Sequence, residues 1–400
     1  MTTVVDFSEI LPVSKNVYVF NPSIAHYRDD LYLCSYRAFV RYPQILQKSE
    51  TYDYTEEYIT DPNHPWLGGI KGDLWWNPEY GYDLTEFVML KITPDNQVTL
   101  DIDYLNSGII NSTKTEMINP GIMAGVDGRL LKLSDNKFII SYNVAISDGM
   151  IIGNDKTCDK KCTLIATRII QINPGNKSMI LGNETILCPS ISKMIEKNWS
   201  LSRVSDTDVS LSYSIESSHE LYRLKIDRDV VSCTEVHISQ SAPFFIALET
   251  YYNNQISISV STPTISLGDS VRLGVGHIKY MWADLSVYPQ GSPLVLFTRK
   301  MQRKEGLIVH PVAIYLMFMY TFDYITGQLL SFSEMFSPKS NTLLCYPSGL
   351  TKSPSGKIIL SYGESDSRCK FMSFSQEWME SQLIKGDIIY PSNIAFKMLE

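Results

Sequence analysis

One plan of residues recurs along this chain. A polar or Pro/Gly turn precedes an apolar stretch, a second polar turn follows, and the unit closes on a strand that ends in Ser-Tyr. Four segments have this form: NPSIAHYRDDLYLCSYR (21–37), GVDGRLLKLSDNKFIISYN (125–143), KNWSLSRVSDTDVSLSYSI (197–215) and YPSGLTKSPSGKIILSYGESD (346–366). The wide gap between the last two holds a further candidate unit, from GVGHIKY (274–280) to YLMFMYTFD (315–323). Radial repetition of short strands is the arrangement that protects the edges of such sheets.

This repeat predicts an all-β fold, a five-bladed β-propeller that forms a single domain over residues 1–400. Short runs rich in Val, Ile, Tyr, Phe and Thr alternate with polar residues and end at turn formers, as strands do. We expect a loop insertion on one face around 43–118, where Trp75 and Trp76 either stack on sugar rings or pack in the core. A short helical segment is predicted near 375–384.

Composition narrows the classes of partner and compartment. Hydrophobic residues make up 44% of the chain and charged residues 20%, which is ordinary for a globular protein. A net charge of -8 argues against nucleic acid as a partner, because phosphate backbones are held by a basic face. The first residues lack a secretory signal, and the longest apolar run, Pro311 to Phe322, is too short to cross a bilayer. We therefore expect a cytoplasmic protein with no membrane partner.

The cysteines fit a reducing compartment. There are seven, an odd number without the spacing of a disulfide framework. Cys158 and Cys162 lie close together, but no second Cys or His pair accompanies them, which favours free thiols over zinc. We expect no metal site and no cofactor.

The repeat also predicts where a site would lie. In a propeller the innermost strand of each blade lines the central channel, so the first polar residues of the units converge on one axis. These residues are Asn21, Asp127 with Arg129, Lys197 with Asn198, and His277 with Lys279; Arg37 and Asp366 follow the Ser-Tyr strand ends. Two carboxylates among several basic groups form a net cationic set, which suits an anionic substrate or cosubstrate.

The units resemble, in the same order, those of a known family. NPSI with the Arg37 strand, GVDGR, KNWSL, GVGHIKY and YPSGL with SYGESD are similar to the motifs of the β-mannoside phosphorylases and mannosidases of glycoside hydrolase family 130 and of related propeller mannosyltransferases. The resemblance implies a five-bladed propeller that performs inverting glycosyl transfer on a carbohydrate. Val126 and Gly128 stand where the family has Glu and Pro, so the substrate can differ from a β-mannoside.

Carried over position by position, the resemblance implies roles for single residues. Asp127 would be the proton donor. Arg129, Lys197, His277 and Lys279 would hold phosphate or a donor group, and the sugar-binding residues would be Asn21, Arg37, Asn198 and Asp366. Arg129 beside Asp127 would lower the carboxyl pKa and oppose an acid role unless burial compensates.

The chemistry favours transfer to or from phosphate over hydrolysis. An inverting hydrolase needs an acid and a separate base that activates water, whereas phosphate is already a nucleophile and needs only cations to hold it. The same cations could hold the diphosphate of a sugar nucleotide, so a sugar-nucleotide-dependent glycosyltransferase stays open. A non-catalytic glycan-binding propeller is a further alternative.

Each residue also has a purely structural interpretation. Asp127-Gly128 is a common pair in hairpin turns. Lys197 could cover the ring of Trp199, His277 could be a core histidine, and Asp366 could cap a turn. The Ser-Tyr pairs are interpreted as packing residues.

Overall fold

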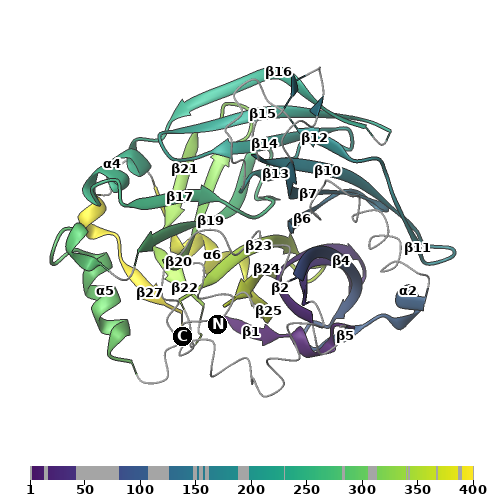
Figure 1. The fold of residues 1–400 in the computed structure, drawn as a ribbon, viewed down its shortest axis with the longest axis horizontal. Coiled ribbons are helices and arrows are strands. Elements are labelled where there is room, and N and C mark those ends of the chain that lie inside the picture. Colours follow the sequence, from purple (N-terminus) through teal and green to yellow (C-terminus); the bar gives the residue numbers. More distant parts are fainter. Residues whose placement is uncertain are drawn as a thin grey trace.

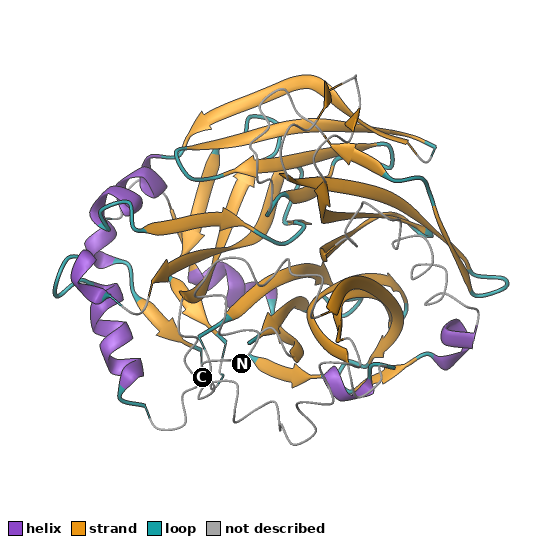
Figure 2. Cartoon of the chain, viewed as in Figure 1, coloured by secondary structure: helices purple, strands orange, loops and turns teal. Residues whose placement is uncertain are grey.

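Strands that follow one another in the sequence pair antiparallel and form separate sheets around a common centre (Figure 1). The computed structural model describes residues 2–12, 17–41, 81–106, 126–146, 151–152, 156–157, 162–187, 198–228, 230–281, 284–304, 313–338, 340, 343–365, 368–385 and 390–399. Strands dominate this part of the chain, and helices are few (Figure 2). The predicted all-β propeller arrangement is confirmed.

Four sheets have the simple form of a propeller blade. The first contains β2 (Val17–Arg28), β3 (Leu31–Arg41), β4 (Gly81–Ile92) and β5 (Val98–Leu100). The second contains β6 (Val126–Ser134), β7 (Lys137–Ile146), β10 (Cys162–Asn173), β11 (Ser178–Leu181) and β12 (Thr185–Leu187). The third contains β13 (Ser200–Arg203), β14 (Asp208–Ser214), β15 (Ser218–Asp227) and β16 (Val230–Ser241).

The fourth simple sheet joins the two ends of the chain. It contains β23 (Cys345–Lys352), β24 (Ile358–Glu364), β25 (Arg368–Phe374) and the first strand of the chain, β1 (Thr3–Asp6). β1 pairs antiparallel with β25, Thr3 opposite Ser373. Backbone hydrogen bonds between the first and last parts of the sequence thus close the ring.

The remaining large sheet departs from the predicted plan of five like blades. It has eight strands: β17 (Ile256–Val260), β18 (Ile265–Ser266), β19 (Val271–Met281), β20 (Ala313–Asp323), β21 (Leu329–Ser333), β22 (Met335–Ser337), β26 (Leu383–Lys385) and β27 (Phe396–Met398). The described residues therefore form four simple blades, not five, because C-terminal strands extend this sheet. A separate hairpin pairs β8 (Ile151–Ile152) with β9 (Lys156–Thr157).

The predicted start of the unit within this sheet is also corrected. GVGHIKY lies in β19, which pairs with β17 and β18 on one side and β20 on the other. It is therefore an internal strand, because the residues before it, 256–266, supply strands at the edge. From Ala313 onward, the longest apolar run of the sequence lies in β20, most of whose side chains are buried.

Helices and short turns cover the outside. The α-helices are α2 (Ile102–Asn106), α4 (Pro243–Tyr251), α5 (Pro293–Gln302) and α6 (Gln376–Gln382), and the 3-10 turns are η1 (Ser8–Ile10), η5 (Leu285–Val287) and η6 (Pro391–Asn393). α6 falls within the predicted segment 375–384, where the Ser375 hydroxyl accepts a hydrogen bond from Trp378 N and caps the helix. None of the helices in the described ranges is long and apolar enough to span a bilayer.

The predicted insertion at 43–118 falls partly outside the described residues. Its described part, 81–106, contains β4 and β5, which extend the first sheet, and α2. Residues 81–92 thus belong to the first sheet, because they pair with β3; the rest of the predicted insertion stays a prediction. Trp75 and Trp76 lie outside the described residues.

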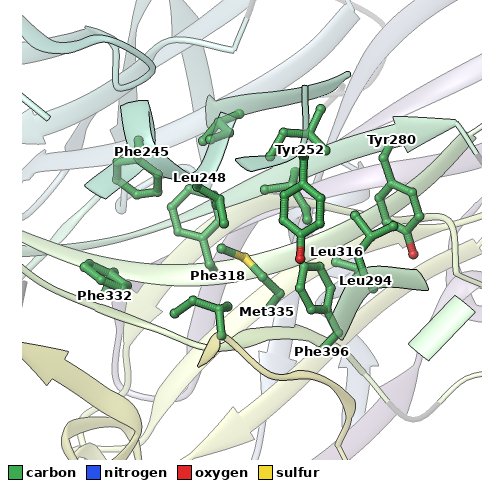
Figure 3. Close-up of a cluster of buried hydrophobic side chains, with 14 of the residues drawn as sticks. Phe245, Leu248, Tyr252, Tyr280, Leu294, Leu316, Phe318, Phe332, Met335 and Phe396 are labelled. Atoms are coloured by element: carbon green, nitrogen blue, oxygen red, sulfur yellow. The ribbon is translucent and has the colours of Figure 1, made fainter. Parts of the chain in front are cut away.

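Apolar cores fill the spaces between neighbouring sheets. One of them packs β17, β19 and β20 under α4 and α5, with Phe245, Leu248, Phe318 and Met335 at its centre (Figure 3). Burial of such side chains is the main force that holds sheet against sheet.

The repeated Ser-Tyr pairs do pack, as predicted, and two of the serines also link sheets. The hydroxyl of Ser361 on β24 accepts a hydrogen bond from the backbone amide of Ile24 on β2, at 3.1 Å. The hydroxyl of Ser35 on β3 donates to the carbonyl of Gly128 on β6, at 3.4 Å. Buried polar groups need partners, and these hydroxyls provide them where inner strands meet.

Candidate functional site

Three residues in or just before β2, β6 and β13 share an unusual backbone conformation. Asn21 on β2, Asp127 on β6 and Asn198 just before β13 have positive φ angles of 49°, 58° and 62°. Asn and Asp adopt this left-handed conformation more readily than other side-chain-bearing residues. The strand register shifts at Asn21 and at Asp127, between Phe20 and Ser23 and between Val126 and Arg129. Such bulges redirect side chains. Here they direct them toward one polar cluster, formed by Asn21, Arg37, Asp127, Arg129, Asn143, Asn198 and Tyr346.

Asp127 is the centre of that cluster. Its Oδ1 accepts hydrogen bonds from Asn21 Nδ2 at 2.8 Å and from Arg37 Nη1 at 3.3 Å, and its Oδ2 accepts one from Asn143 Nδ2 at 3.3 Å. The side chain is 16% exposed. The hairpin-turn interpretation is wrong, because Asp127 lies at a bulge inside β6 while the turn to β7 falls at 135–136.

The surroundings of Asp127 favour its ionised form. Burial alone would raise the pKa of this carboxyl group, but the charges of Arg37 and Arg129 and the hydrogen bonds from Asn21 and Arg37 outweigh it, so the pKa is lowered from its ordinary value. The opposition to an acid role expected from the sequence is therefore present in the fold. The Asp127 carboxyl group is therefore ionised at neutral pH.

Arg129 forms the second half of the cluster. It is fully buried, and its Nη1 donates to the carbonyl oxygen of Asp127 at 3.2 Å. Its Nη2 donates to Asn198 Oδ1 at 3.2 Å and to the hydroxyl of Tyr346. Among the described residues, Arg129 Nε has no partner. A guanidinium held in this way is fixed in orientation and charge.

Tyr346 on β23 connects this half to His277. Its hydroxyl donates to Asn198 Oδ1 at 2.6 Å, and its ring centroid lies 5.3 Å from that of His277. Burial is the main reason why the pKa of Tyr346 is raised to about 12, so the hydroxyl stays protonated. Hydrogen bonds and ring contacts thus run from Asp127 through Arg129 and Tyr346 to β19.

His277 and Lys279 lie at the margin of the cluster. His277 is buried, and its Nδ1 shares a hydrogen bond of 2.6 Å with the hydroxyl of Ser261. The Lys279 ammonium lies 5.6 Å from the ring centroid of Tyr315, which in turn contacts His277.

The fold thus brings together most of the residues named from the sequence. Asn21, Arg37, Asp127, Arg129 and Asn198 are joined by hydrogen bonds. Lys197, Asp366 and Cys158 lie outside the described residues, so their predicted roles stay predictions.

Sequence reasoning missed Asn143 and Tyr346. Asn143 follows a Ser-Tyr pair as Arg37 does, so the repeat contained the signal for it. Tyr346 opens the YPSGL unit, but nothing in that unit marks its hydroxyl as a partner of Arg129 and Asn198.

The cluster has the elements of a group-transfer site: one ionised carboxylate, two fixed guanidinium groups and several amides that can orient hydroxyl groups. No protein-family model matches the chain, and no curated protein does.

Solved structures with a similar course of the chain include three mannose enzymes. A mannose phosphorylase from Leishmania mexicana, MPT-4, is 11% identical over 93% of this chain and 89% of its own, with a TM-score of 0.41. MPT-1 from the same organism, a GDP-Man-dependent mannosyltransferase, is 9% identical over 98% and 94%, with a TM-score of 0.42. Beta-1,2-mannobiose phosphorylase from Listeria innocua is 9% identical over 95% and 98%, also with a TM-score of 0.42. Likeness at this level says nothing about the reaction or substrate of this chain.

Proposed function

We propose that this chain is a carbohydrate-active enzyme that transfers a glycosyl group with inversion on mannoside-like glycans, to or from phosphate. The observation that carries the proposal is the polar cluster itself. Among the described residues of the cluster the one carboxylate is that of Asp127, which feels the charges of Arg37 and Arg129 and is oriented by amides. The motif resemblance supplies the substrate class.

Because its pKa is lowered, Asp127 is better suited to accept a proton, as synthesis requires, than to donate one, as phosphorolysis requires. In synthesis, a hydroxyl of the acceptor sugar attacks the anomeric carbon of a sugar phosphate, its proton passes to the Asp127 carboxylate, and the phosphate leaves with the bonding electrons. In phosphorolysis, the protonated form of Asp127 must return that proton to the leaving sugar. Cationic groups hold the phosphate in both directions, so the reaction needs no further cofactor.

The proposal includes a fifth blade, formed by the eight-stranded sheet. Two apolar cores support this role. One joins that sheet to β15 through residues such as Leu221 and Ile258, and the other joins β19 to β23 and β24 through Leu273, Leu350 and Leu360. In this proposal the sheet acts as a blade between two simple ones, with β21, β22, β26 and β27 as additions.

Donor specificity provides the test. The purified protein is given mannose 1-phosphate with mannose, GDP-mannose with mannose, or manno-oligosaccharides with inorganic phosphate, and the release of phosphate, GDP and sugar is followed. We expect acceptor-dependent phosphate release from the first donor. Asp127→Asn should lower it by about 100-fold or more, because general acid-base groups contribute that much. Asp206→Asn, which removes a surface carboxylate paired with Arg203, is the matched control and should keep full activity.

Other outcomes select the alternatives. Release of GDP that requires an acceptor identifies the sugar-nucleotide-dependent transferase. Sugar binding without turnover, unchanged in Asp127→Asn, contradicts the enzyme proposal and leaves a glycan-binding propeller.

A further inference from the structure

Asn143 directly follows one of the repeated Ser-Tyr pairs, so it can be compared with the residue at the same position in the other sheets. The residue after each Ser-Tyr pair is Arg37 in the first sheet, Asn143 in the second, Ser214 in the third and Gly363 in the last simple sheet. Arg37 and Asn143 both contact Asp127, from β3 and β7 respectively. The carboxylate is thus held from the neighbouring sheet and from its own.

The orientation of the Asn143 amide is fixed by chemistry. An ionised carboxylate only accepts hydrogen bonds, so the amino group of Asn143 must face Asp127 and the Oδ1 atom must point away. In the described part of the chain that Oδ1 is buried without a hydrogen-bond partner. Burying an acceptor without a hydrogen-bond partner costs free energy of folding. The favourable contribution of the Asn143 amide is therefore its hydrogen bond to Asp127.

The two oxygens of Asp127 are not equivalent. Oδ1 accepts from both Asn21 and Arg37, whereas Oδ2 accepts only from Asn143 among the described residues. A carboxylate oxygen can accept two hydrogen bonds, so Oδ2 keeps capacity for one more donor. The Asp127 side chain is 16% exposed, and Oδ2 is the oxygen with the free acceptor capacity.

We propose that Asn143 is a positioning residue that fixes Oδ2 of Asp127 as the oxygen that exchanges a proton with a hydroxyl of the bound sugar. The inference rests on the proposed function for the identity of the ligand, but the placement of the carboxylate is testable without turnover. Within the described ranges, three titratable or charged groups also face Asp127: Arg37 on β3, Arg129 on β6 and Tyr346 on β23. None of these is altered by a change at Asn143.

The test is a direct titration of the Asp127 carboxyl group. The protein is labelled with carboxyl-13C aspartate, Asp127→Asn identifies the signal, and the signal is followed against pH in Asn143→Leu and Asn143→Ser. Both changes remove a donor that favours the ionised form, so the titration midpoint should move upward by about one pH unit. Asn143→Ser is the gentler variant and carries the test if Asn143→Leu does not fold, as judged by circular dichroism.

A matched control separates positioning from stability. Asn136→Ala removes an asparagine from the far end of the same β6–β7 hairpin, where it accepts a hydrogen bond from the Tyr27 hydroxyl at 3.2 Å. It should leave the Asp127 midpoint unchanged. Folded Asn143 variants whose midpoint equals that of the wild type overturn the inference. If no donor is turned over but the midpoint moves as expected, the proposed reaction fails while the positioning role stands.

Discussion

Arg37 on β3 and Asp127 on β6 form an ion pair between two adjacent sheets, with Arg37 Nη1 3.3 Å from Asp127 Oδ1. Their side chains are only 10% and 16% exposed. The pair therefore joins the first two sheets at the same point where it sets the charge state of the proposed catalytic carboxylate.

Removing Arg37 should destabilise the protein. Arg37→Leu leaves the Asp127 charge buried beside fewer partners, and breaking such a pair costs about 3 kcal/mol in the free energy of unfolding. Urea denaturation measures the loss. The control is Arg368→Leu, which breaks an ion pair with Asp6 whose side chains are 40% and 30% exposed, and it should cost less than about 1 kcal/mol. Equal losses of unfolding free energy in Arg37→Leu and Arg368→Leu would contradict the burial of the ion pair between Arg37 and Asp127.

The contribution of Asp127 to stability should depend on pH. Its folded-state pKa is depressed, so the stabilisation is fully present above the pKa of the unfolded chain, near ~3.9, and is lost as pH falls through the folded pKa. The difference in unfolding free energy between wild type and Asp127→Asn is measured from neutral to acid pH. It should be constant near neutrality and shrink in the acid range; a difference that grows on acidification would reverse the sign of the assigned shift.

Gly363 should be intolerant of a side chain. A Cβ atom added there would lie 2.0 Å from Asn21 Oδ1 and 2.7 Å from Asn21 N. Gly363→Ala must therefore displace Asn21 from Asp127, and overpacking of this kind costs about 1–3 kcal/mol. Thermal unfolding and turnover should both suffer. Gly268→Ala, where nothing lies within 4 Å of the added atom, should be close to neutral in the same assays.

The Tyr346 hydroxyl should contribute more to stability than the buried hydroxyl of Tyr362. Tyr346→Phe removes a partner of both Arg129 and Asn198, and an unsatisfied buried group costs about 1–3 kcal/mol. Tyr362→Phe removes a buried hydroxyl that has no partner among the described residues, so it should cost little or nothing. Chemical denaturation of the two variants side by side measures the contrast. A larger loss in Tyr362→Phe would refute the assigned network.

The sequence predicted the part of the site that follows from local repetition. Asn21, Asp127 and Asn198 open equivalent units, and equivalent units place equivalent residues on one axis once the strands form sheets. Asn143 and Tyr346 depend instead on how one sheet is oriented toward the next, which no local pattern encodes.

Local sequence patterns also failed to predict the strand order of the eight-stranded sheet. GVGHIKY has the turn and apolar pattern of a first strand. The strands formed by 256–266 pair with it, however, so it is an internal strand of the sheet and not the edge strand. The added strands β26 and β27 come from the C-terminal part of the chain, far from this unit in sequence, so the unit itself carried no signal for them.

The most direct test of the account is a crystal structure of the protein with mannose and inorganic phosphate. We expect the sugar at the polar cluster, with one hydroxyl within hydrogen-bonding distance of Asp127 Oδ2 and Asn143 still in contact with that oxygen. A sugar bound elsewhere on the molecule, with the cluster around Asp127 closed and unchanged, would contradict it.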